Sequence, residues 1–227
     1  MLQRDYLMKM VEMLTTVLMK VLNLKESKNY TEALKELEAA GKTIAGLDFE
    51  MVKVLKTDDL VSLMKTSDVY AGRCLISAGL LSGYADILKT QNDRQCYDYY
   101  NKSFRLYTEA LLTKEIPDPE KYIEKADQLI PVLLSAGFFS DERPENYPAL
   151  FEYYYLSGKY SKAEDVLFDI LESDFPETND KGRMRKRAVT FYKDLISKDE
   201  TELVKGNFSM EEARESLQEI LNQIKSN

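Results

Sequence analysis

The stretch from Tyr147 to Pro176, YPALFEYYYLSGKYSKAEDVLFDILESDFP, contains two short amphipathic patterns of helical period, joined at Gly158-Lys159. A pair of helices this short cannot bury its apolar faces alone. The stretch therefore predicts further helices stacked against the pair. Surfaces of such stacked helices commonly bind another molecule.

The composition of the whole chain agrees with this prediction. The chain has 227 residues, of which 44% are apolar, and only 9 are glycine and 6 proline. This length suits one domain of moderate size or a short solenoid. The low glycine and proline content favours a packed, mostly helical protein.

The complete absence of histidine restricts the chemistry that the chain can support. It excludes catalytic pairs in which histidine is the base, histidine-containing zinc and iron sites, and haem ligation by histidine. We expect no cofactor, no metal and no enzymatic activity. Of the two cysteines, Cys74 lies in an apolar run, whereas Cys96 lies near Arg94 and an expected helix start, which favours a modestly activated thiol.

The cysteines also bear on location, because they show no CxxC spacing and no even-numbered framework. Charged side chains interrupt the first 25 residues, which excludes a signal peptide of ordinary pattern. Uncharged stretches such as Cys74 to Ala85 are shorter than the ~18 residues of a membrane span. We expect a soluble protein of the reducing cytoplasm.

Helical periodicity extends along the chain. Leu7, Val11, Leu14, Leu18 and Val21 follow steps of four and three, which predicts a first helix with a broad apolar face, buried on two sides. A second helix is expected from about Asn29 to Gly46, followed by a connector with short helices to residue 66. Residues 1–66 would then form an N-terminal hairpin and connector.

Residues 67–227 are expected to form one continuous region of helical repeats. Its first helix, 67–90, contains glycine, alanine and serine at spacings that allow a neighbouring backbone to approach closely. The other helices are expected at 93–114, 118–137, 144–157, 159–174, 180–197 and 209–225. The chain would contain about nine to eleven helices in all.

The stretch from Tyr147 to Pro176 resembles a tetratricopeptide unit. Tyr147, Leu150 and Tyr154 stand at conserved apolar places of the first helix of that family, and Ala163 and Leu167 at places of the second. Pro176 comes one residue late. The resemblance implies an all-α array of antiparallel helix hairpins, a right-handed superhelix with degenerate repeats.

One position departs from the tetratricopeptide pattern. Phe151 stands where the family has glycine, and we expect its ring to push the two helices apart. The resemblance also implies which residues would line a peptide groove on the first helix, namely Glu145, Ala149, Glu152 and Tyr155. Such a groove would be acidic and aromatic and would prefer a cationic ligand.

The whole chain also resembles an uncharacterised bacterial family of helical proteins of unknown function. The resemblance rests on three segments near the N-terminus: RDYLMKMVEMLTTVLMKVL at 4–22, YTEALKELEAA at 30–40 and GLDFEMVKVLKTDDLVSLM at 46–64. It implies no activity.

A basic block between two acidic stretches is the sharpest feature of the charge pattern. Residues 181–198 contain seven basic side chains and one acidic, whereas eleven carboxylates precede them within 139–180 and seven follow within 199–227. The block contains candidates for oxyanion binding, Lys181, Arg183, Arg185, Lys186 and Arg187. The adjacent acidic stretches favour internal charge pairing instead, and the net charge of −8 opposes binding to nucleic acid or an anionic membrane.

These observations favour a non-enzymatic scaffold that binds an unknown protein or peptide. Two alternatives belong to other classes. The first is a homodimeric structural protein that associates through the apolar N-terminal helix. The second is an enzyme that uses only carboxylates or tyrosines, which requires two acids converging in one cleft.

Overall fold

Twelve α-helices and two shorter helical turns make up the part of the chain that this computed structural model describes, residues 2–140, 142–172 and 181–225. No strand occurs within these residues, so the all-α prediction is confirmed. The number of helices exceeds the expected nine to eleven. One of them, α11, lies where the apolar pattern predicts no helix.

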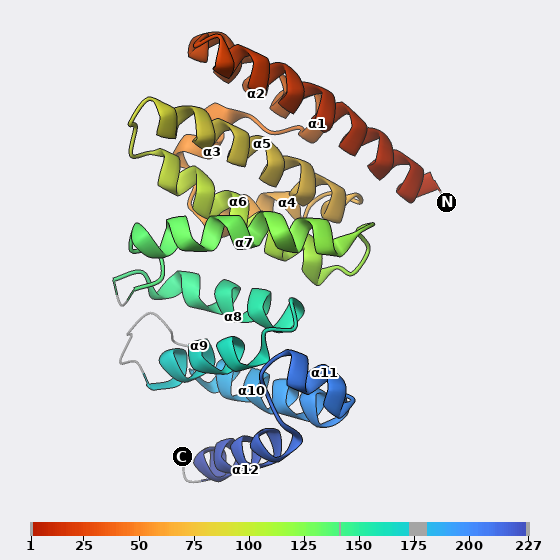
Figure 1. Ribbon diagram of the computed structural model, residues 1–227, viewed down its shortest axis with the longest axis vertical. Helices are drawn as coiled ribbons and strands as arrows, with labels where there is room; N and C mark the ends of the chain where they lie inside the picture. The colour runs from red at the N-terminus through yellow and green to blue at the C-terminus, as the bar shows by residue number, and fades with distance from the viewer. Residues whose placement is uncertain (1, 141, 173–180, 226–227) are drawn as a thin grey trace. The chain divides into compact units, whose positions relative to one another are not determined.

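Figure 1 labels the helices in the order in which they occur along the chain. Their bounds are α1 Leu2–Glu26, α2 Tyr30–Ala40, α3 Phe49–Val54, α4 Thr57–Met64, α5 Tyr70–Thr90, α6 Cys96–Leu112, α7 Pro119–Ser135, α8 Tyr147–Leu156, α9 Tyr160–Glu172, α10 Lys181–Ile196, α11 Glu200–Lys205 and α12 Met210–Lys225. A π-helical turn, Gly41–Ala45, follows α2, and a 3-10 turn, Pro144–Asn146, precedes α8.

The chain divides into two units, Met1–Ala136 and Gly137–Asn227. The boundary expected between residues 66 and 67 lies inside the first unit. Helices from both sides of that expected boundary pack together there, because α5 contacts α1, α2 and α4. The small residues of α5 permit this packing.

Glycines on α5 allow α1 to lie close against it, as the small-residue pattern predicts. A Cβ atom at Gly79 would lie 2.8 Å from a methyl carbon of Leu14, and one at Gly83 would lie 3.1 Å from a methyl carbon of Leu18. Leu7 makes the corresponding contact with Gly72. The main apolar stripe of α1 is therefore used inside the first unit.

The expectation that α1 is buried on two sides is wrong for part of its apolar surface. Met13 and Leu22, which widen the apolar stripe in the sequence, are exposed, and so are Met8 and Met19. The reason is that α1 packs on α2 and α5 along one side only.

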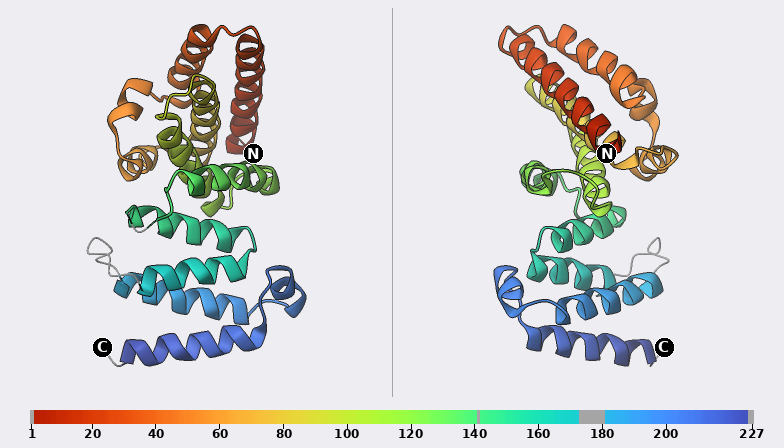
Figure 2. Two further views of the ribbon diagram at one scale, coloured as in Figure 1. Left: turned by 60° about the vertical axis from the view of Figure 1, so that its left-hand side comes forward. Right: turned by 90° about the vertical axis from the view of Figure 1, so that its right-hand side faces the viewer.

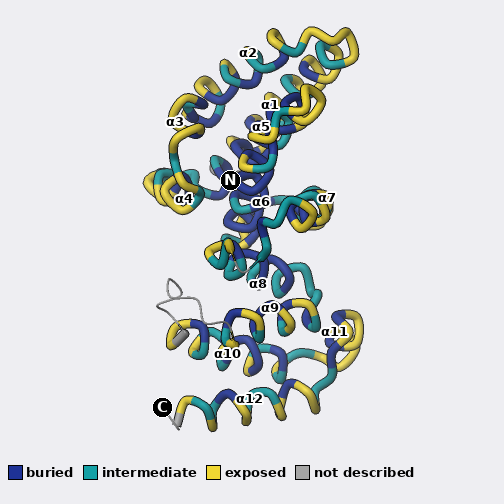
Figure 3. The backbone as a smooth tube through the Cα atoms, turned by 90° about the vertical axis from the view of Figure 1, so that its left-hand side faces the viewer, coloured by how far each residue is buried: buried dark blue, intermediate teal, exposed yellow. Residues whose placement is uncertain are grey.

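Helices α5 and α6 form the centre of the first unit. Figure 3 shows them as its most buried segments, with α3 and α4 on one side and α7 on the other, and the right-hand view of Figure 2 agrees. An aromatic cluster of Phe49, Tyr84 and Tyr99 joins α3 to this centre, with ring centroids 4.8 Å apart in two of its three pairs. Helix α7 packs on the other side of α6, where Tyr107 and Tyr122 stack.

The second unit is built on the hairpin of α8 and α9. Gly158 ends α8 with a φ of 71°, a left-handed conformation that glycine adopts without strain. Ala163 of α9 is fully buried, as expected for the small residue that lets the pair close. Phe151 does not push the two helices apart, because its ring is fully buried and contacts Phe191 of α10 edge-on at 5.4 Å.

The remaining helices complete the second unit. Helix α10 packs on α9 and α12. The side chain of Asp199 accepts a hydrogen bond from the Thr201 amide at 2.8 Å and so caps α11. Ser209 and Glu212 form a reciprocal capping box at the start of α12. None of the described helices combines the length and the apolar character needed to cross a membrane.

Candidate functional site

The four residues expected to line a peptide groove occupy different environments in the second unit. Glu145 is exposed in the 3-10 turn before α8, and Ala149 is buried. Glu152 and Tyr155 are partly exposed and lie one turn apart on α8. Glu152 and Tyr155 both form hydrogen bonds with side chains of the basic helix α10.

The carboxylate of Glu152 is occupied by Arg187 of the basic block. The guanidinium donates two hydrogen bonds to it, Nε to Oε1 at 2.6 Å and Nη2 to Oε2 at 2.7 Å. The same guanidinium lies over the rings of Phe151 and Tyr155, 5.2 and 4.9 Å from their centroids. The internal pairing that the flanking charges favour is therefore present at Arg187.

The hydroxyl of Tyr155 is occupied in the same way. It donates a 2.6 Å hydrogen bond to Asp194 of α10. Burial and this carboxylate raise the pKa of Tyr155 to about 12. Two groups of the acidic and aromatic face expected on α8, the carboxylate of Glu152 and the hydroxyl of Tyr155, therefore have partners on α10.

The other candidates for oxyanion binding in the basic block differ in their exposure. Arg183 and Lys186 lie on the exposed side of α10, and the side chain of Lys181 lies outside the described residues. Arg185 is partly buried, and its Nε has no hydrogen-bond partner. Neither of the two pockets described in the first unit is lined by Arg183, Arg185 or Lys186.

The two cysteines are buried. Burial raises the pKa of Cys74 to about 12 and also raises the pKa of Cys96. The expectation of an activated thiol at Cys96 is therefore wrong, because desolvation outweighs the neighbouring positive charge. Within the described residues, no group of three or more cysteines and carboxylates is placed to hold a metal ion.

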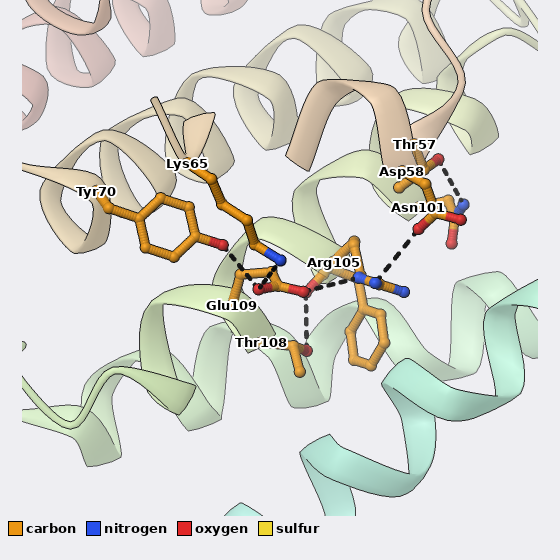
Figure 4. A network of polar contacts seen from close by, with 9 residues as sticks. Thr57, Asp58, Lys65, Tyr70, Asn101, Arg105, Thr108 and Glu109 are labelled. Atoms are coloured by element: carbon orange, nitrogen blue, oxygen red, sulfur yellow. Dashed lines mark hydrogen bonds and ion pairs between the residues drawn. The ribbon is translucent and has the colours of Figure 1, made fainter. Parts of the chain in front are cut away.

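A polar network joins α6 to α4 and α5 (Figure 4). Glu109 accepts a 2.7 Å hydrogen bond from the hydroxyl of Tyr70 and a 3.2 Å hydrogen bond from Nε of Arg105. Arg105 also lies 3.3 Å from a carboxylate oxygen of Asp58. Because the charges neutralise one another, this network serves to hold α4 on α6.

A recess of about 470 Å³ lies in the first unit and is lined by side chains of α1, α5, α6 and α7. Its charged residues are three lysines, Lys25, Lys89 and Lys125, and one aspartate, Asp86. We call it the lysine pocket. Its apolar lining comes mainly from α1 and α7 and consists of Leu18, Val21, Leu22, Ile87, Leu129 and Val132.

The lysines of this pocket have no carboxylate partners. None of the three ammonium groups lies within 4.0 Å of a carboxylate of the described chain. Asp86 instead accepts a 2.6 Å hydrogen bond from the hydroxyl of Tyr100. Burial and the nearby charge of Lys121 lower the pKa of Lys125, and the charge of Asp86 opposes this effect without cancelling it. The pocket therefore has an excess of positive charge in a chain that is acidic overall.

Tyr107 adds an unpaired hydroxyl to the pocket. Its side chain is 3% exposed, and its oxygen lies 3.6 Å from the position of a Cβ atom built on Gly79, another lining residue. Among the described residues this hydroxyl has no hydrogen-bond partner. Burial raises the pKa of Tyr107, so the hydroxyl stays protonated at neutral pH.

Sequence reasoning did not find the lysine pocket. Its residues come from positions 18 to 132 and carry no common motif. The periodicity of α6 places Tyr107 on an inner face but does not show which helix would lie opposite it. The only signal in the sequence is the set of small residues on α5, which marks where α1 approaches.

Comparison with known proteins gives a family but no activity. No match was found among curated proteins or among solved structures. One family model matches residues 1–225, nearly the whole chain, and its description is a family of unknown function, DUF6483. The match agrees with the whole-chain resemblance to an uncharacterised family. The chain therefore belongs to the DUF6483 family of unknown function.

Proposed function

We propose that this protein is a non-enzymatic binding protein whose ligand presents an anionic group to the lysine pocket. The observation that supports the proposal is that three lysines line one recess and that none of their ammonium groups lies within 4.0 Å of a carboxylate in the described chain. An ammonium group that has no carboxylate partner can form a charge-assisted hydrogen bond with an anionic ligand. Such a ligand would supply the counter-charge that the described chain does not supply.

The charge of the whole chain limits which anions can enter. The chain has 39 acidic and 31 basic side chains. At the ionic strength of a cell, charges are screened beyond about 8 Å, so a ligand inside the recess interacts mainly with the local lysines. A large polyanion such as nucleic acid, or an anionic membrane, would also meet the acidic surface outside it.

A protein or peptide partner, which the tetratricopeptide resemblance implies, would supply the anion as an acidic side chain. The face formed by Glu152 and Tyr155 is less suited to anchor such a partner, because Arg187 and Asp194 already occupy these groups. The alternative of an enzyme has less support at the lysine pocket, since its lining contains one carboxylate, Asp86, rather than two.

The proposal can be tested without knowing the ligand. Thermal unfolding would be followed in the presence of a panel of small carboxylates, phosphates and sulfonates, and of amines of the same size. A ligand that binds only the folded protein stabilises it by about 2.7 kcal/mol at a concentration of 100 times its Kd. We expect anions, and not amines, to raise Tm.

Charge-matched variants make this test specific. Lys89→Gln/Lys125→Gln removes two charges from the pocket, whereas Lys9→Gln/Lys193→Gln removes two exposed charges outside it. We expect the first variant to lose the anion-dependent rise in Tm and the second to keep it. Equal rises in the two variants, or stabilisation by amines alone, would contradict the proposal.

A homodimer is a second candidate, supported by the exposed apolar residues of α1. Met8, Met13, Met19 and Leu22 are between 44% and 64% exposed. Light scattering of the wild-type protein over a range of concentrations would show a dimer, and Met13→Glu/Met19→Glu should convert it to a monomer. A wild-type protein that is monomeric at every concentration would exclude this candidate.

A further inference from the structure

We infer that the ligand of the lysine pocket is a small anionic amphiphile, an oxyanion head group attached to a short apolar chain. This inference rests on the proposed function and adds the chemical class of the ligand. The pocket combines a charged lining with an apolar one, contains one unpaired hydroxyl, and has the size of a small-molecule site.

The charged lining provides a site for the head group. Lys89 lies near the end of α5, with its ammonium 5.8 Å from the centre of the Tyr100 ring, and Lys125 is partly buried on α7. Lys25, in the last turn of α1, contributes the third charge. Ammonium groups can bind either carboxylate or phosphate oxygens, because they act as point charges without the planar geometry of arginine.

The apolar lining provides a site for the chain of the ligand. Leu18, Val21 and Leu22 of α1 and Leu129 and Val132 of α7 line the same recess as the lysines. Leu22 is 54% exposed, so part of this apolar surface is in contact with water when the pocket is empty. Burial of a hydrocarbon chain against it would be favourable.

Tyr107 supplies a polar group inside the pocket. The hydroxyl of Tyr107 lies beside Gly79 and has no hydrogen-bond partner within the described chain. Because Tyr107 lines the recess, its hydroxyl can donate a hydrogen bond to a molecule that enters. A ligand oxygen that accepts its hydrogen bond would satisfy it.

The size and polarity of the pocket favour a small amphiphile over an acidic peptide. A volume of about 470 Å³ is within the usual range of about 300–1,000 Å³ for small-molecule sites. A peptide segment would bring a backbone N–H and C=O with every residue, and each needs a partner when buried. The leucine and valine part of the lining offers none, and the uncharged partners in the rest of the lining are a few side chains such as Ser82 and Gln128.

Isothermal titration with six probes tests the class of ligand. Octanoate, octyl phosphate and octylamine share a chain and differ in the head group, whereas acetate and inorganic phosphate lack the chain. Acetyl-Glu-Glu-Glu-amide represents an acidic peptide. We expect octanoate or octyl phosphate to bind at least about tenfold more tightly than its short counterpart, because each buried methylene contributes to affinity.

The outcomes separate this inference from the proposed function. Stronger binding of octanoate than of octyl phosphate would identify a carboxylate head group, and the reverse would identify a phosphate; either supports the inference. Binding of the peptide alone, or equal binding of acetate and octanoate, would overturn the inference and leave the proposed function standing. If no anion binds, both fail. Preferential binding of octylamine would also contradict both.

Two substitutions on α1 form a matched pair for locating the chain of the amphiphile. Leu22→Glu places a negative charge in the pocket, and Met19→Glu places the same charge on an exposed residue outside its lining. We expect the first to weaken binding of the eight-carbon anion about tenfold or more and the second to leave it unchanged. Equal affinities of the two variants would overturn the assignment, provided that circular dichroism shows both to be folded.

Discussion

Glu152 of α8 and Arg187 of α10 form an ion pair with two parallel hydrogen bonds, at 2.6 and 2.7 Å. Both side chains are less than a quarter exposed. Two aromatic rings lie under the guanidinium, so Arg187 joins α8 to α10 through its charge and through packing. Arg187, which the sequence places among candidates for oxyanion binding, therefore forms an internal contact between two helices of the second unit.

We predict that Arg187→Ala lowers the free energy of unfolding by about 2–3 kcal/mol, because it removes both hydrogen bonds and the packing on Phe151 and Tyr155. Glu152→Gln should cost less, about 1–2 kcal/mol, since an amide can still accept one hydrogen bond. Urea denaturation measures both values. Lys193→Ala, at an exposed position of the same helix, is the control and should change stability by less than about 0.5 kcal/mol.

The coupling between the two residues can be measured separately. In a double-mutant cycle with Glu152→Ala and Arg187→Ala, we expect a coupling energy of about 1–2 kcal/mol that decreases at high salt. Independent, additive effects would show that the two side chains do not interact in solution.

Packing between α1 and α5 gives a second prediction. Gly79→Ala should lower stability by about 1–3 kcal/mol, although alanine favours helix formation, because the added methyl group would lie 2.8 Å from Leu14. Gly182→Ala on α10 is the matched change in open space and should be neutral or stabilising by up to about 1 kcal/mol. Thermal or urea unfolding of the two variants checks the contrast. A stabilised Gly79→Ala protein would show that α1 does not lie this close.

The elements of the fold could be predicted from the sequence because their signals are local. The apolar period around Tyr154 and Ala163 and the glycine at 158 predict the α8–α9 hairpin without any knowledge of other segments. Helix α11 was missed because six residues are too few for a periodic pattern. Asp199 and the acidic residues after it are the signal that could have predicted it.

The binding surfaces could not be predicted in the same way. Whether Glu152 is available to a ligand depends on Arg187, which lies 35 positions further along the chain on another helix. The lysine pocket requires Lys25, Lys89 and Lys125 to meet, and helical periodicity does not determine how helices pair. The orientation of Phe151 toward Phe191 is likewise a result of this pairing.

The unpaired hydroxyl of Tyr107 gives a third prediction. Tyr107→Phe should leave the free energy of unfolding unchanged or raise it by up to about 1 kcal/mol, because the hydroxyl has no hydrogen bond to lose in the described structure. Tyr192→Phe is the matched change and should cost about 1–2 kcal/mol, since it removes a 2.8 Å hydrogen bond to Glu164. Urea denaturation without added ligand compares the two. Similar losses in both variants would indicate that Tyr107 has a partner.

The last prediction concerns pH and Glu164 of α9. Burial raises the pKa of this carboxyl above its ordinary value of 4.5, and the nearby carboxylates of Glu212 and Asp165 add to the rise. Hydrogen bonds from Tyr192 and Ser216, at 2.8 and 2.9 Å, oppose it without cancelling it. The folded protein therefore binds this proton more tightly than the unfolded chain does.

The sign of the effect follows from that difference. The stability contributed by protonated Glu164 is fully present below the unfolded pKa and is lost as pH rises through the folded pKa. Glu164→Gln stays neutral and can still accept from Tyr192 and Ser216, so its stability should exceed that of the wild type increasingly as pH rises from about 4 to 7. The difference can grow by no more than about 1.4 kcal/mol per pH unit for one proton. Urea denaturation at several pH values measures the stability of Glu164→Gln relative to the wild type. Glu200→Gln, at an exposed position, is the control. A stability difference between Glu164→Gln and the wild type that stays constant with pH, as expected for the control, would refute the prediction.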